Sequence, residues 1–151
     1  MNPGASVKFK QWAPENFAKV IDYLVEKYKA RIYIVGSKTE LKLDKKVKEL
    51  SKYQDNIEIK NEETLYELLG VISGSRGVIS NETCTQHMAV ALGKKVYCIT
   101  TGIGYKSTYP YPNYKNAIYL YPKDLNKKNS NNKILDINEI SPEHIIKKIK
   151  F

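Results

Sequence analysis

The chain contains few of the residue types that bind metals or build disulfide frameworks. Its 151 residues include two cysteines, Cys84 and Cys98, and two histidines, His87 and His144. The cysteine spacing is not that of a zinc site, and the histidines lie far apart in sequence. The sequence therefore excludes a disulfide framework, leaves a single disulfide open and predicts no metal site.

Long apolar runs are also missing. No run approaches the roughly 20 residues that a helix needs to cross a bilayer. Residues 1–4 do not begin a basic stretch followed by an apolar one, which is the pattern of a secretory signal. We therefore expect a soluble cytoplasmic protein. The length of the chain favours a single domain, residues 1–151, with its own core.

Arginine is scarce in a chain that is otherwise strongly basic. The formal net charge is +9, and Arg31 and Arg76 are the only arginines. Because arginine is the side chain that most often reads the bases of a duplex, we expect no sequence-specific nucleic acid binding. A basic surface that binds nucleic acid or anionic lipid through charge alone stays open as an alternative function.

Hydrophobic periodicity predicts alternating helices and strands along most of the chain. Helices are expected at residues 14–29, 39–52, 62–73, 83–92 and 142–150, and short strands at 31–36, 57–59, 77–80, 95–99 and 117–121. Residues 100–116 are expected to form a long loop, and residues 123–133 a flexible surface loop. This alternation favours a right-handed parallel α/β sheet. We predict a Rossmann-like, three-layer α/β/α domain with about five or six strands.

Apolar spacing within these helices also predicts which side chains face the core. In the helix at 14–29 the periodic residues are Phe17, Val20, Ile21, Leu24 and Val25, and in the helix at 142–150 the inward residues are expected to be Ile145, Ile146 and Ile149. In the helix at 39–52 the inward residues are expected to be Leu41, Val47 and Leu50. In the helix at 62–73 they are expected to be Leu65, Leu68, Leu69 and Ile72.

The first candidate site is the turn that precedes the first helix. Residues 3–6 combine a glycine turn with the hydroxyl of Ser6, and Lys10 follows. Such a loop can hold an anion through its amides and the lysine charge. It is not a Walker loop, because the Gly-Lys-Ser/Thr ending is absent. The simpler alternative is a solvated loop with Trp12 packed against the core.

The second candidate lies at residues 80–87, where a strand ends and a helix begins. Free amides at that helix start would favour a phosphate, and Glu82 would suit sugar hydroxyls better than a phosphate. The alternative is ordinary capping by Ser80, Asn81 or Thr83, with His87 hydrogen-bonded in the core.

The third candidate is the turn at residues 36–40. Glu40 could accept a hydrogen bond from a ribose hydroxyl, or it could simply complement the helix dipole. All three turns follow strands, and ligands of parallel sheets bind at the carboxyl ends of the strands. The three signals therefore converge on one edge of the sheet.

These segments resemble the C-terminal domain of glycosyltransferase family 9, the ADP-heptose:lipopolysaccharide heptosyltransferases. Residues 3–6 with Lys10, Trp12 and the pair Pro14-Glu15 are similar to its opening loop and helix. Residues 32–36 with Glu40 are similar to its second strand and ribose-contacting turn. Residues 80–93 resemble its Asp-Thr-Gly…His…Ala-Ala-Leu-Gly signature. The resemblance spans roughly residues 2–100.

The resemblance implies one half of a GT-B glycosyltransferase, in which the C-terminal domain holds an ADP-sugar and requires no metal or other cofactor. The residues that would bind the nucleotide sugar are Ser6, Lys10, Glu40, Glu82, Thr83, Cys84 and His87. By this resemblance Ser6, Lys10 and Thr83 would contact the diphosphate. Glu82 would contact the sugar, and Glu40 the ribose.

The sequence departs from the family at two positions and in length. Glu82 replaces the usual Asp, and Cys84 replaces the usual Gly, so the donor sugar stays open. Only Met1 and Asn2 precede the opening loop, which indicates a shortened first strand. The acceptor domain, which carries the family's catalytic base, is expected outside this chain. We therefore expect no catalytic residue here and no transfer by the chain alone.

The resemblance further implies a lipopolysaccharide or lipooligosaccharide core as acceptor, and peripheral association with the cytoplasmic face of the inner membrane. A module that binds nucleotide without taking part in catalysis is the remaining alternative.

Overall fold

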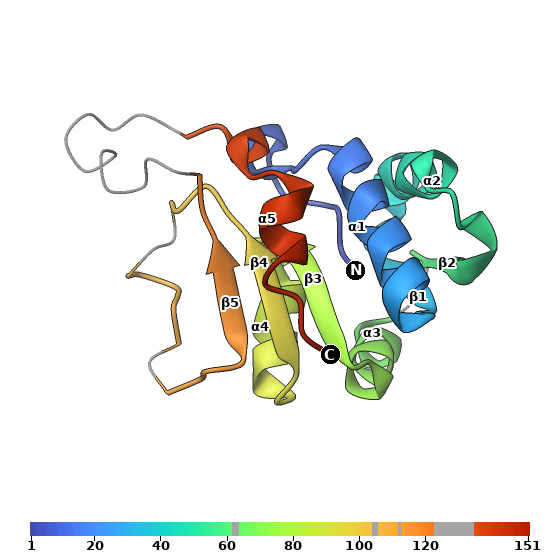
Figure 1. Ribbon diagram of the computed structural model, residues 1–151. Helices are drawn as coiled ribbons and strands as arrows, with labels where there is room; N and C mark the ends of the chain where they lie inside the picture. The colour runs from blue at the N-terminus through green and yellow to red at the C-terminus, as the bar shows by residue number, and fades with distance from the viewer. Residues whose placement is uncertain (62–63, 104–105, 112, 123–134) are drawn as a thin grey trace.

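The computed structural model describes residues 1–61, 64–103, 106–111, 113–122 and 135–151 (Figure 1). The surface loop predicted at 123–133 therefore lies wholly outside the described residues, as do the first two residues of the helix predicted at 62–73.

The described elements alternate as the periodicity predicts. The helices are α1 (Pro14–Tyr28), α2 (Leu41–Leu50), α3 (Leu65–Gly74), α4 (Cys84–Ala91) and α5 (Pro142–Ile146). The strands are β1 (Ile32–Val35), β2 (Ile57–Lys60), β3 (Gly77–Asn81), β4 (Lys95–Ile99) and β5 (Ala117–Leu120). Helix α5 is shorter than predicted and ends at Ile146. Beyond it the Lys150 amide donates to the hydroxyl of Tyr97 on β4 at 2.9 Å.

All the described strand pairs are parallel, with β1 beside β2 and β3-β4-β5 in a second group. Residues 1–2 join the two groups. The Val35 amide donates to the Met1 carbonyl at 2.9 Å, and the Asn2 amide donates to the Ile79 carbonyl at 2.9 Å. With residues 1–2 counted as the first strand, the spatial order is 3-2-1-4-5-6, that of a doubly wound dinucleotide-binding sheet. The predicted fold is confirmed, and its switch point lies between residues 1–2 and β3.

Helices cover both faces of the sheet. Helices α1, α2 and α5 lie on one face, and α3 and α4 lie on the other (Figure 1). Because side chains alternate along a strand, neighbouring residues of β3 serve different cores. Ile79 packs in the cluster that contains Phe17 of α1, whereas Val78 packs with Ile72 of α3 and Ala89 of α4.

Two predictions of inward-facing side chains are wrong. Leu50 of α2 is 37% exposed, and the buried positions of this helix are Asp44 and Val47. Leu65 is 57% exposed, because the first turn of α3 projects beyond the core into the mouth of a cleft. Hydrophobic periodicity indicates a face, but it does not indicate where along the helix that face leaves the core.

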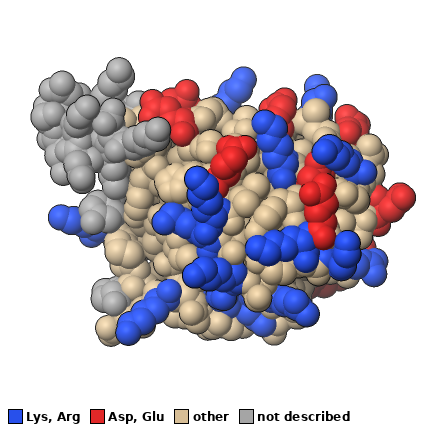
Figure 2. All heavy atoms as spheres, in the orientation of Figure 1, with Lys and Arg blue, Asp and Glu red and all other residues tan. Residues whose placement is uncertain are grey.

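Both cysteines are free, with Cys84 exposed and Cys98 buried, so the disulfide left open by the sequence is not present. Among the described residues, no helix is long and apolar enough to cross a membrane. Figure 2 shows lysine and arginine spread over the face formed by α1 and α5, with acidic side chains between them.

Candidate functional site

A cleft of about 610 Å³ opens at the carboxyl end of the sheet, where the turns after residues 1–2, β1 and β3 meet. Its volume is within the range of small-molecule sites, about 300–1,000 Å³. The start of α3 forms one wall through Leu65 and Leu68. Six of the predicted site residues line it, namely Ser6, Glu40, Glu82, Thr83, Cys84 and His87. The structure thus brings together three segments that are far apart in sequence.

Two buried asparagines fix the loop at residues 3–6 beside β3. The Asn81 side-chain amide donates to the carbonyls of Pro3 at 2.6 Å and Gly4 at 3.2 Å. Its carbonyl oxygen accepts from the Trp12 amide at 3.3 Å. The Asn2 side chain accepts from the Gly4 amide at 2.9 Å and donates to the Thr85 hydroxyl at 2.7 Å. These contacts hold the loop against the start of α4.

The start of α4 has no side-chain cap. Thr83 is the N-cap residue by position, but its side chain makes no capping bond, and its hydroxyl oxygen is buried with no partner among the described residues. Asn81 bonds elsewhere, and Ser80 is fully buried within β3. The alternative interpretation, ordinary capping by one of these side chains, is therefore wrong. An uncapped helix start offers amide donors and a positive dipole end, which together suit a phosphate.

Glu40 closes the turn after β1. One of its carboxylate oxygens accepts from the Ser37 amide at 2.7 Å and the Ser37 hydroxyl at 2.9 Å, in a capping box. The other oxygen lies over Gly4, where an added Cβ would come within 1.7 Å of it. Glu40 therefore has a local role at the start of the helical segment after β1, as part of this capping box. It also lines the cleft. Its contact with ribose stays a prediction.

A buried polar pair behind this turn was missed by the sequence reasoning. Asn61 donates to the Ser37 carbonyl at 2.9 Å and makes a short hydrogen bond to Asp44. Asp44 is fully buried, and this burial raises its pKa to about 6. Asp44 lies in a strongly charged helix, and Asn61 follows a short strand, so neither stands out in the sequence. Together they tie α2 and the end of β2 to the rim of the cleft.

Lys10 and Glu82 form an ion pair, with Lys10 Nζ 3.2 Å from Glu82 Oε1. Their side chains are 18% and 11% exposed. Lys10 does not line the cleft itself. The sequence assigned these residues to different parts of a ligand, whereas in the structure they contact each other. The contact of Lys10 with a diphosphate stays a prediction.

His87 is half-buried in the wall of the cleft rather than enclosed in the core. Its Nδ1 makes a short hydrogen bond to the hydroxyl of Tyr111, and the two rings meet edge to face with centroids 5.9 Å apart. The prediction of a core-bonded histidine is therefore wrong. Tyr111 lies in the long loop predicted at 100–116, and no role in the site was predicted for it.

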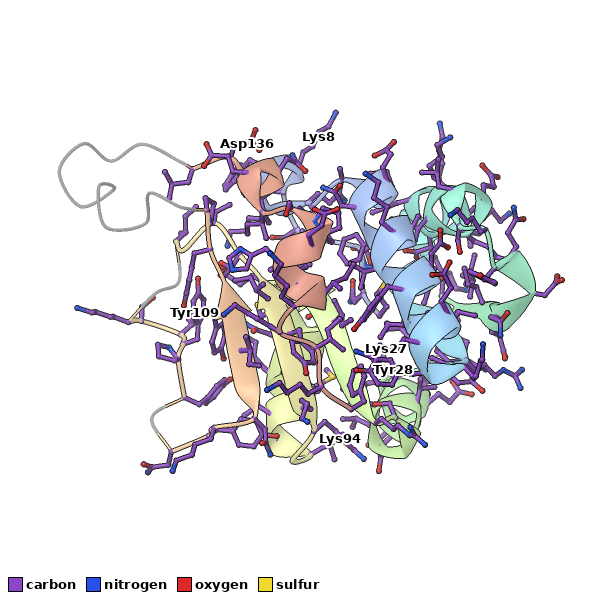
Figure 3. All side chains as sticks on the ribbon, viewed as in Figure 1. Lys8, Lys27, Tyr28, Lys94, Tyr109 and Asp136 are labelled. Carbon is purple, nitrogen blue, oxygen red and sulfur yellow. The ribbon has the colours of Figure 1, made fainter. Side chains whose placement is uncertain are left out.

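A second cavity, of about 330 Å³, lies near the opposite end of the sheet. It is lined by Leu24 and Tyr28 of α1, by Gly77 of β3 and by Phe151. Figure 3 shows Tyr28 near that end, whereas Lys8 projects from the end where the larger cleft opens. Parallel sheets bind ligands at the carboxyl ends of their strands, which favours the larger cleft.

Within the described part of the chain, no group of three or more His, Cys, Asp or Glu residues is placed to hold a metal ion. Independence from metal stays a prediction.

Comparison with protein-family models matches residues 1–136 to glycosyltransferase family 9 (heptosyltransferase). Comparison with curated proteins found no match.

Three solved structures share the fold. A family 9 glycosyltransferase from Veillonella parvula matches with a TM-score of 0.76 and 22% identity, over 97% of this chain and 43% of its own. E. coli ADP-heptose lipopolysaccharide heptosyltransferase II matches with a TM-score of 0.78 and 15% identity, over 97% and 43%. E. coli heptosyltransferase WaaC, solved with ADP-2-deoxy-2-fluoro heptose, matches with a TM-score of 0.71 and 18% identity, over 97% and 40%.

This chain thus spans less than half the length of each of these structures. Because the family model covers most of the chain and the described fold agrees with it, the chain belongs to glycosyltransferase family 9.

Proposed function

We propose that the cleft at the carboxyl end of the sheet binds the ADP-sugar donor of a glycosyl transfer reaction. One observation carries the proposal: the uncapped start of α4 meets the loop at residues 3–6 at the switch point of a doubly wound sheet. Nucleotide diphosphates bind at this point in such folds. One E. coli neighbour is an ADP-heptose lipopolysaccharide heptosyltransferase, and the other, WaaC, was solved with ADP-2-deoxy-2-fluoro heptose. Both descriptions support adenosine diphosphate as the nucleotide.

In the proposed complex the diphosphate lies between the loop and α4. The amides after Thr83 and the hydroxyl of Ser6 donate to its oxygens from two sides. Lys10 lies 3.2 Å from Glu82 and is a source of positive charge near this position. A departing nucleoside diphosphate gains negative charge in the transition state, so these donors would stabilise it electrostatically.

The nucleoside is assigned to the other side of the cleft. Glu40 lies at the turn after β1, where its carboxylate can accept from a ribose hydroxyl. Leu65 and Leu68 form an apolar wall that suits an adenine ring. The exposure of Leu65, which contradicts its predicted core position, is explained by this role.

The sugar is assigned to Glu82, which lines the cleft next to Thr83. A carboxylate accepts hydrogen bonds from sugar hydroxyls but repels phosphate, so its place beside a diphosphate site indicates a polyhydroxylated group. Glu82 replaces the usual Asp of the family, and the donor sugar is therefore left open.

The complete reaction would transfer this sugar to a lipopolysaccharide or lipooligosaccharide core, without metal, at the cytoplasmic face of the inner membrane. The acceptor and the catalytic base are assigned to an acceptor domain that faces this cleft in a GT-B arrangement. This chain covers 40–43% of the length of the similar solved structures. That coverage supports the proposal that it corresponds to the donor-binding half of the enzyme.

Calorimetric titration of the chain with ADP, UDP and GDP tests the proposal. We expect weak but selective binding of ADP, because half of the enclosing surface would come from the acceptor domain. Adenosine should bind more weakly than ADP, since it lacks the diphosphate. A clear preference for UDP, or equal weak binding of all three nucleotides, would overturn the donor assignment.

A further inference from the structure

Tyr109, which follows β4 along the chain, has no part in the proposed function, although it is buried close to the site. Tyr109 is 2% exposed, and its ring stacks on Tyr119 of β5 with centroids 4.7 Å apart and planes 10° apart. Figure 3 shows Tyr109 beside β5. Its side chain is therefore held by the sheet, and its hydroxyl has a defined position.

That hydroxyl belongs to a buried hydrogen-bond network that ends on Glu82. The Thr100 hydroxyl donates to Glu82 Oε2 at 2.6 Å. The Tyr109 hydroxyl lies 2.7 Å from Thr100 Oγ1 and 3.2 Å from Glu82 Oε2. The Gly102 amide donates to Thr100 Oγ1 at 3.0 Å. Thr100 is fully buried, directly after β4.

The number of protons available determines which group donates and which accepts in this network. Each hydroxyl has a single proton to donate. Since Thr100 donates its proton to Glu82, the proton of Tyr109 is shared between Thr100 and Glu82. Burial raises the pKa of Tyr109 above its ordinary value, so the phenol stays protonated and remains a donor. The donors therefore all point towards the carboxylate, an arrangement in which each bond strengthens the next.

Counting acceptor positions shows what Glu82 has left for a ligand. A carboxylate has about four lone-pair positions, two on each oxygen. Thr100 and Tyr109 occupy those of Oε2, and Lys10 takes one position on Oε1 at 3.2 Å. With the partners that the described residues supply, a single position on Oε1 remains. The side chain is 11% exposed and lines the cleft, so a ligand can reach it.

We propose that Thr100 and Tyr109 are positioning residues that fix the Glu82 carboxylate so that Oε1 accepts one hydroxyl of the donor sugar. This inference rests on the proposed function, which it deepens by stating how the sugar is recognised. The same segment also carries Tyr111, whose hydroxyl contacts His87 in the cleft wall. In this proposal Tyr109 and Tyr111 support the sugar side of the cleft, while Glu40 and the turn after β1 serve the nucleoside side.

If Thr100 and Tyr109 position Glu82, their loss should weaken binding of ADP-heptose but not binding of ADP. If their role is purely structural, both affinities should fall together. Loss of the Tyr109 or Thr100 hydroxyl should weaken binding of ADP-heptose by roughly three- to tenfold, the range for one net hydrogen bond. Binding of ADP should change by less than about twofold, because the nucleotide does not contact Glu82. The variants are Tyr109→Phe and Thr100→Val, each titrated with both ligands.

Two control variants match these changes closely. Tyr119→Phe removes a buried hydroxyl from the other ring of the same stack, and that hydroxyl has no partner among the described residues. It should leave both affinities unchanged. Thr100→Ser keeps the hydroxyl that reaches Glu82 and should restore binding of ADP-heptose. Equal losses of ADP and ADP-heptose in Tyr109→Phe, or no loss of either, would overturn the proposal.

A second measurement tests the contact without any ligand. In a double-mutant cycle on urea unfolding, Tyr109→Phe and Glu82→Ala should be non-additive by about threefold or more in the unfolding equilibrium constant, as expected of directly bonded side chains. Tyr119→Phe and Glu82→Ala should be additive. Additivity in the Tyr109 cycle would overturn the positioning role even if ligands bind. Failure of the unmodified chain to bind ADP would instead overturn the proposed function.

Discussion

Among single side chains, the pairing of Lys10 with Glu82 most changes what the sequence led us to expect. Lys10 was expected to contact a diphosphate and Glu82 a sugar, yet the Lys10 side chain is only 18% exposed and lies 3.2 Å from the Glu82 carboxylate. Removal of one partner from a largely buried pair leaves the other charge without compensation. Lys10 therefore has a structural partner as well as a proposed ligand.

Replacement of Lys10 tests its role at the diphosphate. Lys10→Ala should weaken ADP binding by about 1.5–3 kcal/mol, the range for hydrogen bonds to charged groups. The matched control is Lys8→Ala, because Lys8 is exposed and projects away from the molecule (Figure 3). It should have almost no effect in calorimetric titration. Equal losses at both positions, or none at either, would refute the diphosphate contact.

Asp44 gives a prediction about stability and pH. Its folded-state pKa is raised from 3.8 to about 6 by burial. A carboxyl with a raised pKa stabilises the fold at low pH and loses that contribution as the pH rises through the folded value. Asp44→Asn should therefore increase the free energy of unfolding by about 1–3 kcal/mol at pH 7.5, but by less than about 1 kcal/mol at pH 4.

Urea unfolding at both pH values measures this difference. The same change at the exposed residue Asp55 should be nearly silent at either pH. If Asp44→Asn destabilised the fold at pH 7.5, the hydrogen bond between Asp44 and Asn61 would outweigh the cost of burying the charge, and the account of this pair would be wrong.

Among the secondary-structure elements, the start of α4 is the most informative. Its first residue, Cys84, carries an exposed thiol in the wall of the cleft, whereas Cys98 is buried on β4. Burial also raises the pKa of Cys98 well above its ordinary value, which makes that thiol unreactive. One thiol per chain should therefore react with N-ethylmaleimide in the folded protein.

Bound ADP should protect this thiol, because the diphosphate would lie against the start of α4. At ten times its dissociation constant, ADP should slow the modification roughly tenfold, as mass action requires of a blocked site. Intact mass spectrometry follows the reaction, and Cys84→Ser, which should not react, identifies the residue. An unchanged rate under saturating ADP would show that the nucleotide binds elsewhere.

Some elements and contacts could be predicted from the sequence, and others could not. The strand-to-helix turn at Glu82 and Thr83 follows from periodicity and from local residue types. The role of Asn2 does not, because its side chain bonds to Thr85, 83 positions away in sequence. The exposure of Leu65 was also hidden, since local spacing cannot show that the first turn of α3 extends past the core. Local signals indicated residues that line one cleft, but long-range contacts determine the detailed shape of that cleft.

For the molecule as a whole, a donor-binding half should not complete a transfer. The chain spans 40–43% of the length of the three solved structures described above. The base that activates the acceptor is assigned to the facing domain, so radiolabelled ADP-heptose incubated with this chain and a truncated core acceptor should give no product. Turnover by the purified chain would contradict this division of roles and would place a base within residues 1–151.

The most direct test of the central claim is amide hydrogen exchange of the chain with and without ADP. The account predicts protection at the loop of residues 3–6 and at the start of α4, where the diphosphate is placed. Residues that line the second cavity, such as Tyr28 and Gly77, should exchange at unchanged rates. Protection confined to that second cavity, or no protection under saturating ADP, would contradict the claim that the cleft at the carboxyl end of the sheet is the nucleotide site.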